Sequence, residues 1–167
     1  MKRAAVLMAL VALSACESNL SGHPSAKEVL TALDRPWIGR AGIEQQFFND
    51  EAIEDAVLSG ICTATPEWLE VAHRLFETSN AHLGEELASA LAVALIRRPE
   101  AVLGKFEYRY VCSEPDDLPG ACSVPHWRVA ASDALQKIRD PALAVVKEKC
   151  AVDVARSVGL QSIQESK

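Results

Sequence analysis

The chain has 167 residues and carries 17 Lys and Arg against 23 Asp and Glu, which gives a formal net charge of −6 at pH 7. This acidic excess argues against binding to nucleic acid, which requires a basic surface, and against lying on anionic lipid headgroups. It suits a basic partner protein, although acidic side chains also serve solubility alone.

Residues 1–15 have the pattern of a secretion signal. A positively charged start at residues 1–3 precedes an uncharged apolar run over residues 4–13, and small residues follow. A run of about ten apolar residues is half of the roughly 20 that a membrane-spanning helix needs, which favours a cleaved signal.

The signal ends in the sequence Leu13-Ser14-Ala15-Cys16, which resembles the lipobox of bacterial lipoproteins. The resemblance covers residues 1–16. It implies that a diacylglyceryl group is attached to the Cys16 sulfur, that the chain is cleaved before this residue, and that the new N-terminus is acylated. The alternative is an ordinary signal with an incidental cysteine.

The residue after the cysteine is Glu17, whereas an aspartate there marks retention in the inner membrane in enterobacterial lipoproteins. The resemblance therefore implies the outer membrane, with the protein anchored on its periplasmic face. Residues 16–24 are polar and contain Gly and Pro, which predicts a lipidated tether. Fully extended, residues 17–24 would reach about 26 Å at about 3.3 Å per residue.

Cleavage would remove residues 1–15 together with two of the 17 basic residues, so the mature net charge would be 15 minus 23, or −8. The remaining chain is long enough for one domain with a hydrophobic core. We expect a helical domain over residues 25–158 and a polar C-terminal tail over residues 159–167.

The first predicted helices follow this tether. The pair Ser25 and Glu28 forms a capping-box pattern that opens a short helix, and Pro and Gly break it at residues 34–42. Residues 43–58 have a rough helical period, and Gly60 is expected to end that helix.

Two longer helices are predicted next. Thr65 followed by Pro66 is typical of a helix start, and Asn80 is expected to cap the helix after it. Residues 87–96 are apolar nearly all round but too short to span a membrane, so we expect the central buried helix there. The apolar residues of the earlier helix have helical spacing: Trp68, Leu69, Ala72, Leu75 and Phe76.

A short set of residues recurs after 42 positions. Ala88, Ala92, Ile96, Arg97 and Pro99 return as Ala130, Ala134, Ile138, Arg139 and Pro141. The alanines would let a neighbouring helix approach closely, and the proline would start the following helix. Period and layout resemble HEAT-type helical repeats over residues 65–105 and 126–158. Two ordinary antiparallel helix pairs in a bundle are the alternative, and either arrangement makes the fold all-α.

One segment has a different period. Over residues 105–112 the aromatic residues Phe106, Tyr108 and Tyr110 alternate with charged residues, which predicts a short strand. Residues 121–125 could return as a second strand and close a small hairpin.

Four cysteines remain in the mature chain besides Cys16, and an even number in an exported chain predicts two disulfides. Three pairings are possible. Because Cys112 and Cys122 flank a turn-rich loop, the sequence favours that pair, with Cys62 bonded to Cys150.

The loop that this pairing would close is acidic, since it contains Glu114, Asp116 and Asp117. A disulfide-closed acidic loop would be preorganised to bind a partner. Solvation of an ordinary turn is the alternative.

A second candidate contact is Trp37, which lies in a Pro- and Gly-containing loop with Arg35 and Arg40 nearby. Tryptophan and arginine are typical of interface anchors. The alternative is a loop tryptophan folded back onto the core.

Catalytic and metal-binding motifs are missing from the sequence. It contains no GxSxG nucleophile motif, no Gly-rich phosphate loop and no Cys/His spacing for zinc. His82 has Glu86 four residues later and His73 has Glu77, but solvated helix faces explain both pairs. We therefore expect no enzymatic activity, no cofactor and no bound metal.

These features together predict a lipid-anchored periplasmic module that binds another protein. In general layout the chain resembles immunity lipoproteins, and that resemblance implies neutralisation of a basic toxin that attacks the cell wall. An envelope-assembly scaffold is one alternative, and a hydrolase with unmarked catalytic carboxylates is another.

Overall fold

The computed structural model describes residues 23–35, 45, 49–79, 81–115 and 120–164. Within these residues the chain is helical and contains no strand, which confirms the predicted all-α fold. The elements in chain order are α1 (Ala26–Leu33), α3 (Glu51–Cys62), α4 (Pro66–Thr78), α5 (Ala81–Arg97), α6 (Pro99–Leu103), α7 (Tyr108–Val111), the 3-10 turn η1 (Gly120–Cys122), α8 (Trp127–Gln136), the 3-10 turn η2 (Pro141–Leu143) and α9 (Ala144–Gln164).

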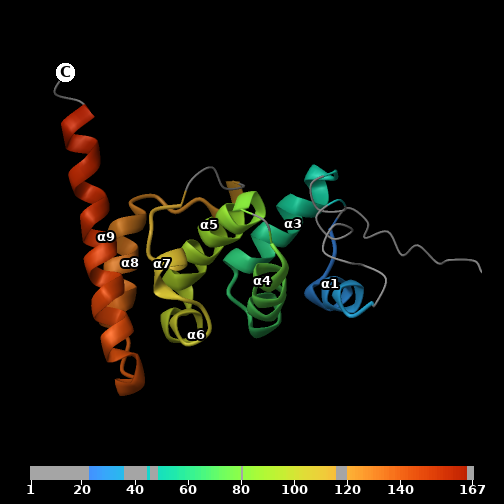
Figure 1. The fold of residues 1–167 in the computed structure, drawn as a ribbon, viewed down its shortest axis with the longest axis horizontal. Coiled ribbons are helices and arrows are strands. Elements are labelled where there is room, and N and C mark those ends of the chain that lie inside the picture. Colours follow the sequence, from blue (N-terminus) through green and yellow to red (C-terminus); the bar gives the residue numbers. More distant parts are fainter. Residues whose placement is uncertain (1–22, 36–44, 46–48, 80, 116–119, 165–167) are drawn as a thin grey trace, which may run out of the picture.

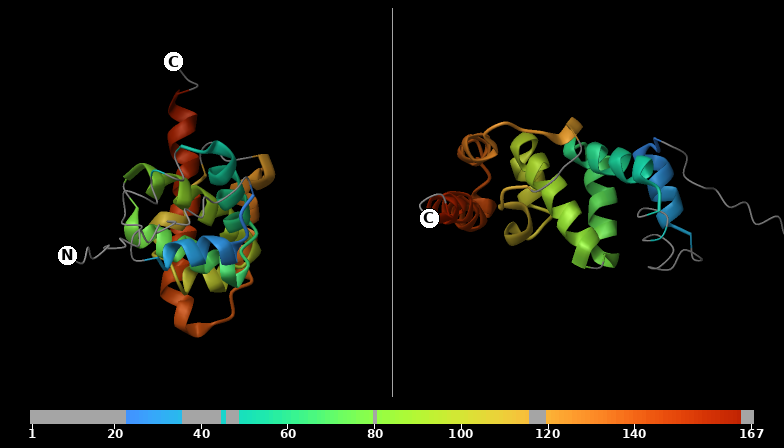
Figure 2. Two further views of the ribbon diagram at one scale, coloured as in Figure 1. Left: turned by 90° about the vertical axis from the view of Figure 1, so that its right-hand side faces the viewer. Right: turned by 90° about the horizontal axis from the view of Figure 1, so that it is seen from above.

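The helices stand side by side along the long axis of the molecule, with α1 at one end and α9 at the other (Figure 1). Seen from above, the helices follow the same order, and the view along the row shows the projecting C-terminal part of α9 (Figure 2). That helix continues to Gln164, past the expected domain end at residue 158. Among the described residues, no helix combines the length and apolarity needed to cross a membrane.

Helix α5 is the centre of this row, as its apolar sequence predicts. It packs against α3, α4, α6, α7 and α8. Its six residues from Ala90 to Leu95 are all buried, and they belong to one continuous hydrophobic core. An α-helix that is surrounded on all sides must be apolar on all sides, which explains this run.

The helix starts follow the local sequence. Ser25 and Glu28 form the capping box of α1, with the Ser25 amide donating to Glu28 Oε2 over 2.7 Å. Thr65 Oγ1 accepts a hydrogen bond from the Trp68 amide at the start of α4. Asn80, the predicted cap of α5, lies outside the described residues.

The prediction that Gly60 ends α3 is wrong, because the helix continues to Cys62. Gly60 is buried inside the helix, beneath Trp68 of α4. A Cβ atom at this position would lie 2.3 Å from Trp68 Cε2, a distance that atoms do not tolerate. The glycine therefore serves the close approach of two helices, and the sequence pattern alone does not distinguish this role from a stop signal.

The predicted strand over residues 105–112 is also wrong, since α7 occupies Tyr108–Val111. Phe106 and Tyr110 both contact Phe76 of α4, with ring centroids 6.5 and 5.1 Å apart. Tyr108 has a different neighbour, Lys149 of α9, whose Nζ lies 5.6 Å from its ring centroid. A regular strand would place all three rings on one face, whereas here the chain is extended at Glu107 and turns into α7, which directs Tyr108 away from the other two rings.

Two disulfides form, as predicted, but the favoured pairing is wrong. Cys62 is bonded to Cys122 and Cys112 to Cys150, with Cα–Cα distances of 5.7 and 5.2 Å. The reason is the path of the chain: α7 packs against α9, whereas η1 packs against α3. Residues 112 and 122 are close in sequence, but the first lies where α7 packs against α9 and the second where η1 packs against α3. The acidic loop is consequently not closed by one disulfide.

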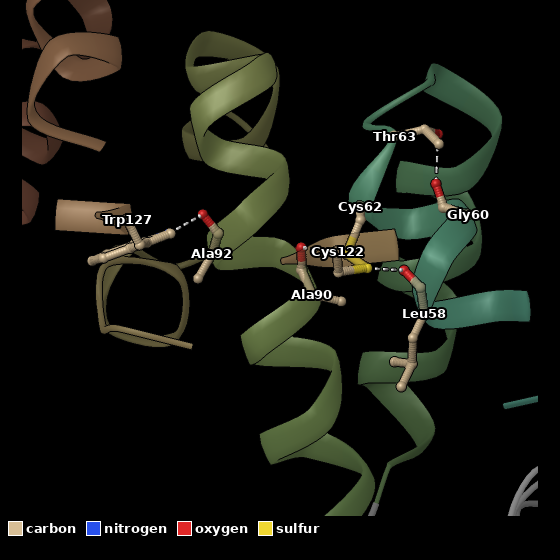
Figure 3. Close-up of a disulfide and its surroundings, with 8 residues drawn as sticks. All are labelled: Leu58, Gly60, Cys62, Thr63, Ala90, Ala92, Cys122 and Trp127. Atoms are coloured by element: carbon tan, nitrogen blue, oxygen red, sulfur yellow. Dashed lines mark hydrogen bonds between the residues drawn. A yellow bond between two sulfur atoms is a disulfide. The ribbon is translucent and has the colours of Figure 1, made fainter. Parts of the chain in front are cut away.

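The region around the Cys62–Cys122 disulfide shows how the row is held together (Figure 3). The Cys122 sulfur lies 3.5 Å from the carbonyl oxygen of Leu58, in the core of α3. On the other side of α5, the buried Trp127 Nε1 donates to the carbonyl oxygen of Ala92 over 2.8 Å.

Candidate protein-binding site

The last two helices enclose a surface hollow of about 290 Å³. Small side chains keep it open, since Ser132 of α8 faces Ala151 and Ala155 of α9. The full lining consists of Arg128, Val129, Ser132, Asp133, Ala151, Val154 and Ala155. We call this the α8–α9 groove.

Both walls of the groove are fixed to the rest of the molecule. Buried Trp127 attaches the start of α8 to α5. The Cys112–Cys150 disulfide attaches α9 to the end of α7, and Cys150 is fully buried. A groove with fixed walls loses little conformational entropy when a partner binds.

Exposed apolar side chains concentrate on the same helix pair. Val129, Val145 and Val152 are 63%, 64% and 43% exposed, and they are three of the four large exposed hydrophobic residues in the described chain. The fourth, Tyr110, contacts Phe76 and lies 5.1 Å from the guanidinium carbon of Arg109. A valine side chain has no polar group that would account for its exposure. Clustered exposed hydrophobic residues are typical of interaction surfaces.

The predicted acidic loop meets this groove at one residue. Glu114 forms an ion pair with Arg128, whose Nε is buried without a hydrogen-bond partner in the described structure. Glu114 is therefore already paired with a residue of the groove lining, Arg128. Asp116 and Asp117 lie outside the described residues.

The second sequence candidate is only partly described. Trp37 and Arg40 fall outside the described residues. Arg35 follows α1 and is half-buried, and its amide donates to the Ala32 carbonyl over 3.2 Å. Helix α1, which it follows, lies at the end of the helix row opposite α8 and α9 (Figure 1), whereas Glu114 is paired with Arg128 of α8.

The structure also brings together two carboxyl groups, Glu54 of α3 and Glu86 of α5, that the sequence analysis did not connect. Partial burial, the charge of Glu86 and a hydrogen bond with it raise the pKa of Glu54 from 4.5 to about 7. His82 Nδ1 lies 3.5 Å from Glu86 Oε1, as the four-residue spacing allows, whereas Glu86 Oε2 is buried without a hydrogen-bond partner. The pair can hold a proton near neutral pH.

The groove was missed because its signal is weak in sequence. Val129, Val145 and Val152 stand beside other apolar residues in the sequence, so the pattern does not show that these three side chains face outward, and single exposed apolar residues are common on ordinary surfaces. The carboxyl pair was missed because helices 32 residues apart meet only in space. The described residues contain no group of three or more His, Cys, Asp or Glu side chains able to hold a metal ion. No family model, no curated protein and no solved structure matches the chain.

Proposed function

We propose that this chain is a lipid-anchored periplasmic module that binds another protein through the α8–α9 groove. The observation that supports it is that α8 and α9, which carry three exposed valines, enclose a hollow that one of them, Val129, lines and whose two walls are fixed in place. Burying apolar surface contributes about 25 cal/mol per Å², which makes such a patch a source of binding energy.

The groove also has features that would select a partner. An apolar side chain of the partner would enter between Ser132 and Ala151, while Arg128 and Asp133 at the rim would pair with its polar groups. Apolar centres with polar rims are typical of protein interfaces. The acidic net charge of the chain would speed the approach of a basic partner.

An immunity protein is the specific form of this proposal. The lipobox would hold the protein in the periplasm, where a toxin that attacks the cell wall acts. A basic toxin would be attracted by the acidic chain and its apolar side chain would occupy the groove. Neutralisation would then follow from covering the toxin's active surface.

The test is affinity capture from the native envelope with a matched pair of variants. Ala151→Arg places a long charged side chain inside the groove, whereas Ala144→Arg makes the same change at an exposed residue outside it on the same helix. We expect the first variant to lose the partner by about tenfold or more, because an unpaired charge would be buried at the contact. Equal capture by both variants would remove the groove from the proposal.

The identity of the captured protein decides between the forms of the proposal. A cell-wall hydrolase that the purified protein inhibits would support the immunity form. A component of an envelope-assembly complex, captured without inhibition, would support the scaffold alternative instead.

A hydrolase is the second candidate, and the carboxyl pair Glu54–Glu86 is the observation that favours it. Carboxyl groups with a pKa near neutrality are suited to general acid–base catalysis. The test is hydrolysis of cell-wall polysaccharide and peptide substrates by the purified protein. Activity that is lost in Glu54→Gln and retained in Glu85→Gln would support this candidate, and no hydrolysis by the parent protein would reject it.

A further inference from the structure

Four cationic side chains lie together where the connections within the two recurring helix pairs meet. Arg97 and Arg98 stand between α5 and α6, and Lys137 and Arg139 stand between α8 and η2; all four are exposed. With Pro99, Glu100 and Ala101 they line a hollow of about 480 Å³, which we call the basic corner. It shares no lining residue with the α8–α9 groove.

The sequence recurrence explains why these residues meet. Arg97 and Arg139 hold equivalent places in the two copies, and the proline two residues later starts the next helical element in each. Glu100 then joins the two corners, because its Oε1 accepts hydrogen bonds from the amides of Arg139 and Asp140 over 2.7 and 3.2 Å. The hollow is thus preorganised by a direct bond between the copies.

The positive charges of the basic corner are only partly compensated inside the described structure. None of its four cations forms an ion pair with a described residue. Other described cations do, namely Arg74, Lys105, Arg109, Arg128 and Arg156. Two carboxylates lie nearby: Glu100 Oε1 accepts the two amides, and Asp140 Oδ1 accepts from the Ala142 amide over 2.9 Å. Both keep their negative charge, so four cations against two carboxylates leave an excess of two positive charges.

Four like charges around one hollow repel each other, and an anion that enters it removes the repulsion. The basic corner is therefore locally positive, although the net charge of the whole chain is negative. Arginine guanidinium groups present planar pairs of donors that match the oxygens of a phosphate, and lysine adds a mobile point charge. A ligand with two or more negative charges is needed to balance the corner.

We propose that the basic corner binds a phosphoryl group that carries at least two negative charges, such as a phosphomonoester or a diphosphate. The group could belong to a lipid headgroup or to a soluble phosphorylated compound, since the oxygens presented to the guanidinium groups are the same. The site is independent of the groove and of the protein partner proposed for it.

The test uses the mature lipidated protein in detergent and inorganic pyrophosphate as the probe, with binding measured by calorimetry. The site variant is Arg97→Gln with Arg98→Gln and Arg139→Gln. The matched control removes the same number of charges outside the corner through Lys27→Gln, Arg109→Gln and Arg156→Gln. We expect saturable binding that weakens by about tenfold or more in the site variant and less than about threefold in the control.

Hydrogen exchange on reconstituted protein then identifies the source of the phosphoryl group. Slower exchange at residues 97–101 and 137–140 in vesicles containing phosphatidic acid, whose headgroup is a phosphomonoester, compared with phosphatidylcholine alone, indicates a lipid headgroup. Pyrophosphate binding with equal exchange in both vesicles indicates a soluble ligand. The proposal is overturned if the parent protein does not bind pyrophosphate, if the control loses as much affinity as the site variant, or if a polyglutamate peptide binds equally well.

Discussion

Glycine has two different roles on this chain, and the contrast is testable at single residues. Gly60→Ala would place a methyl group 2.3 Å from Trp68 Cε2, so the two helices must separate. We expect a loss of about 1–3 kcal/mol of unfolding free energy, measured by urea denaturation, because overpacking outweighs the better helix propensity of alanine.

Gly84→Ala in α5 is the matched control. The added methyl would have only Ser79 Oγ near it, at an ordinary 3.6 Å. Helix propensity then decides the outcome, and the variant should gain about 0.5–1 kcal/mol. If both variants gained stability, the close contact between α3 and α4 would not constrain residue 60.

Glu54 gives a prediction about pH. Its pKa is raised from 4.5 to about 7 in the folded chain. At a pH between these two values, the folded protein therefore holds a proton that the unfolded chain has released. Stability contributed by this group is therefore lost as the pH rises from about 4.5 through about 7. Glu54→Gln should remove this loss and raise stability at pH 8 by about 1 kcal/mol, a modest value because solvent screens a half-exposed carboxylate.

The measurement is urea denaturation at several pH values, with Glu85→Gln on the exposed part of α5 as the control. The control should keep the fall in stability between acidic and neutral pH. A Glu54→Gln profile that runs parallel to that of the parent protein would show that Glu54 does not share its proton with Glu86.

At the scale of the element, the two disulfides link helical segments that are far apart in the sequence. Cys62–Cys122 and Cys112–Cys150 close segments of 60 and 38 residues, and in the loop-entropy model each contributes about 4 kcal/mol. The pairing can be read from the unreduced protein. Proteolysis must first separate Cys112 from Cys122. Because no Lys or Arg lies between them, the protease must cleave at the acidic residues Glu114, Asp116 or Asp117.

After that cut, mass spectrometry should find no disulfide between the peptides that contain Cys112 and Cys122. The first should be linked to the Cys150 peptide and the second to the Cys62 peptide. A product that joins Cys112 to Cys122 would contradict the fold, because α9 and α3 would then have no covalent link to the loop.

Loss of one disulfide should act on a particular element. Replacing Cys112 and Cys150 by Ala frees α9 from α7, and we expect a loss of about 2–5 kcal/mol with faster hydrogen exchange concentrated in α9. The Cys62→Ala and Cys122→Ala protein is the comparison, and its exchange should rise in α3 and η1. Identical exchange maps for the two proteins would mean that the disulfides do not hold separate elements.

Local signals were sufficient for much of the helical layout. The capping residues Ser25 and Thr65, the buried apolar run of α5 and the class of the fold were all predicted correctly, because each depends on neighbours in sequence. The pairing of the cysteines and the role of Gly60 could not be predicted, because both depend on helices that meet only in space. The same reason hid the α8–α9 groove and the basic corner.

At the scale of the whole molecule, the order of the helices determines which end an N-terminally anchored chain would present. The helix that follows the expected tether, α1, lies at one end of the row, and the α8–α9 groove lies at the other (Figure 1). A chain anchored through its N-terminus would therefore present the groove on the side farthest from its attachment. This placement suits capture of a partner in the periplasm.

The last prediction concerns the anchor itself. Pro24 is already buried against the domain, so the free tether is at most residues 17–23, or about 23 Å at about 3.3 Å per residue. A single acyl chain binds membranes only reversibly, whereas the several chains implied at Cys16 would hold the protein stably. Mass spectrometry of the native protein should find an acylated N-terminus at Cys16, and carbonate washing should leave the protein with the membranes. Cys16→Ser should accumulate as the uncleaved precursor or appear in the soluble fraction. An unmodified N-terminus at any other residue would contradict the lipoprotein assignment while leaving the groove and the basic corner to be tested separately.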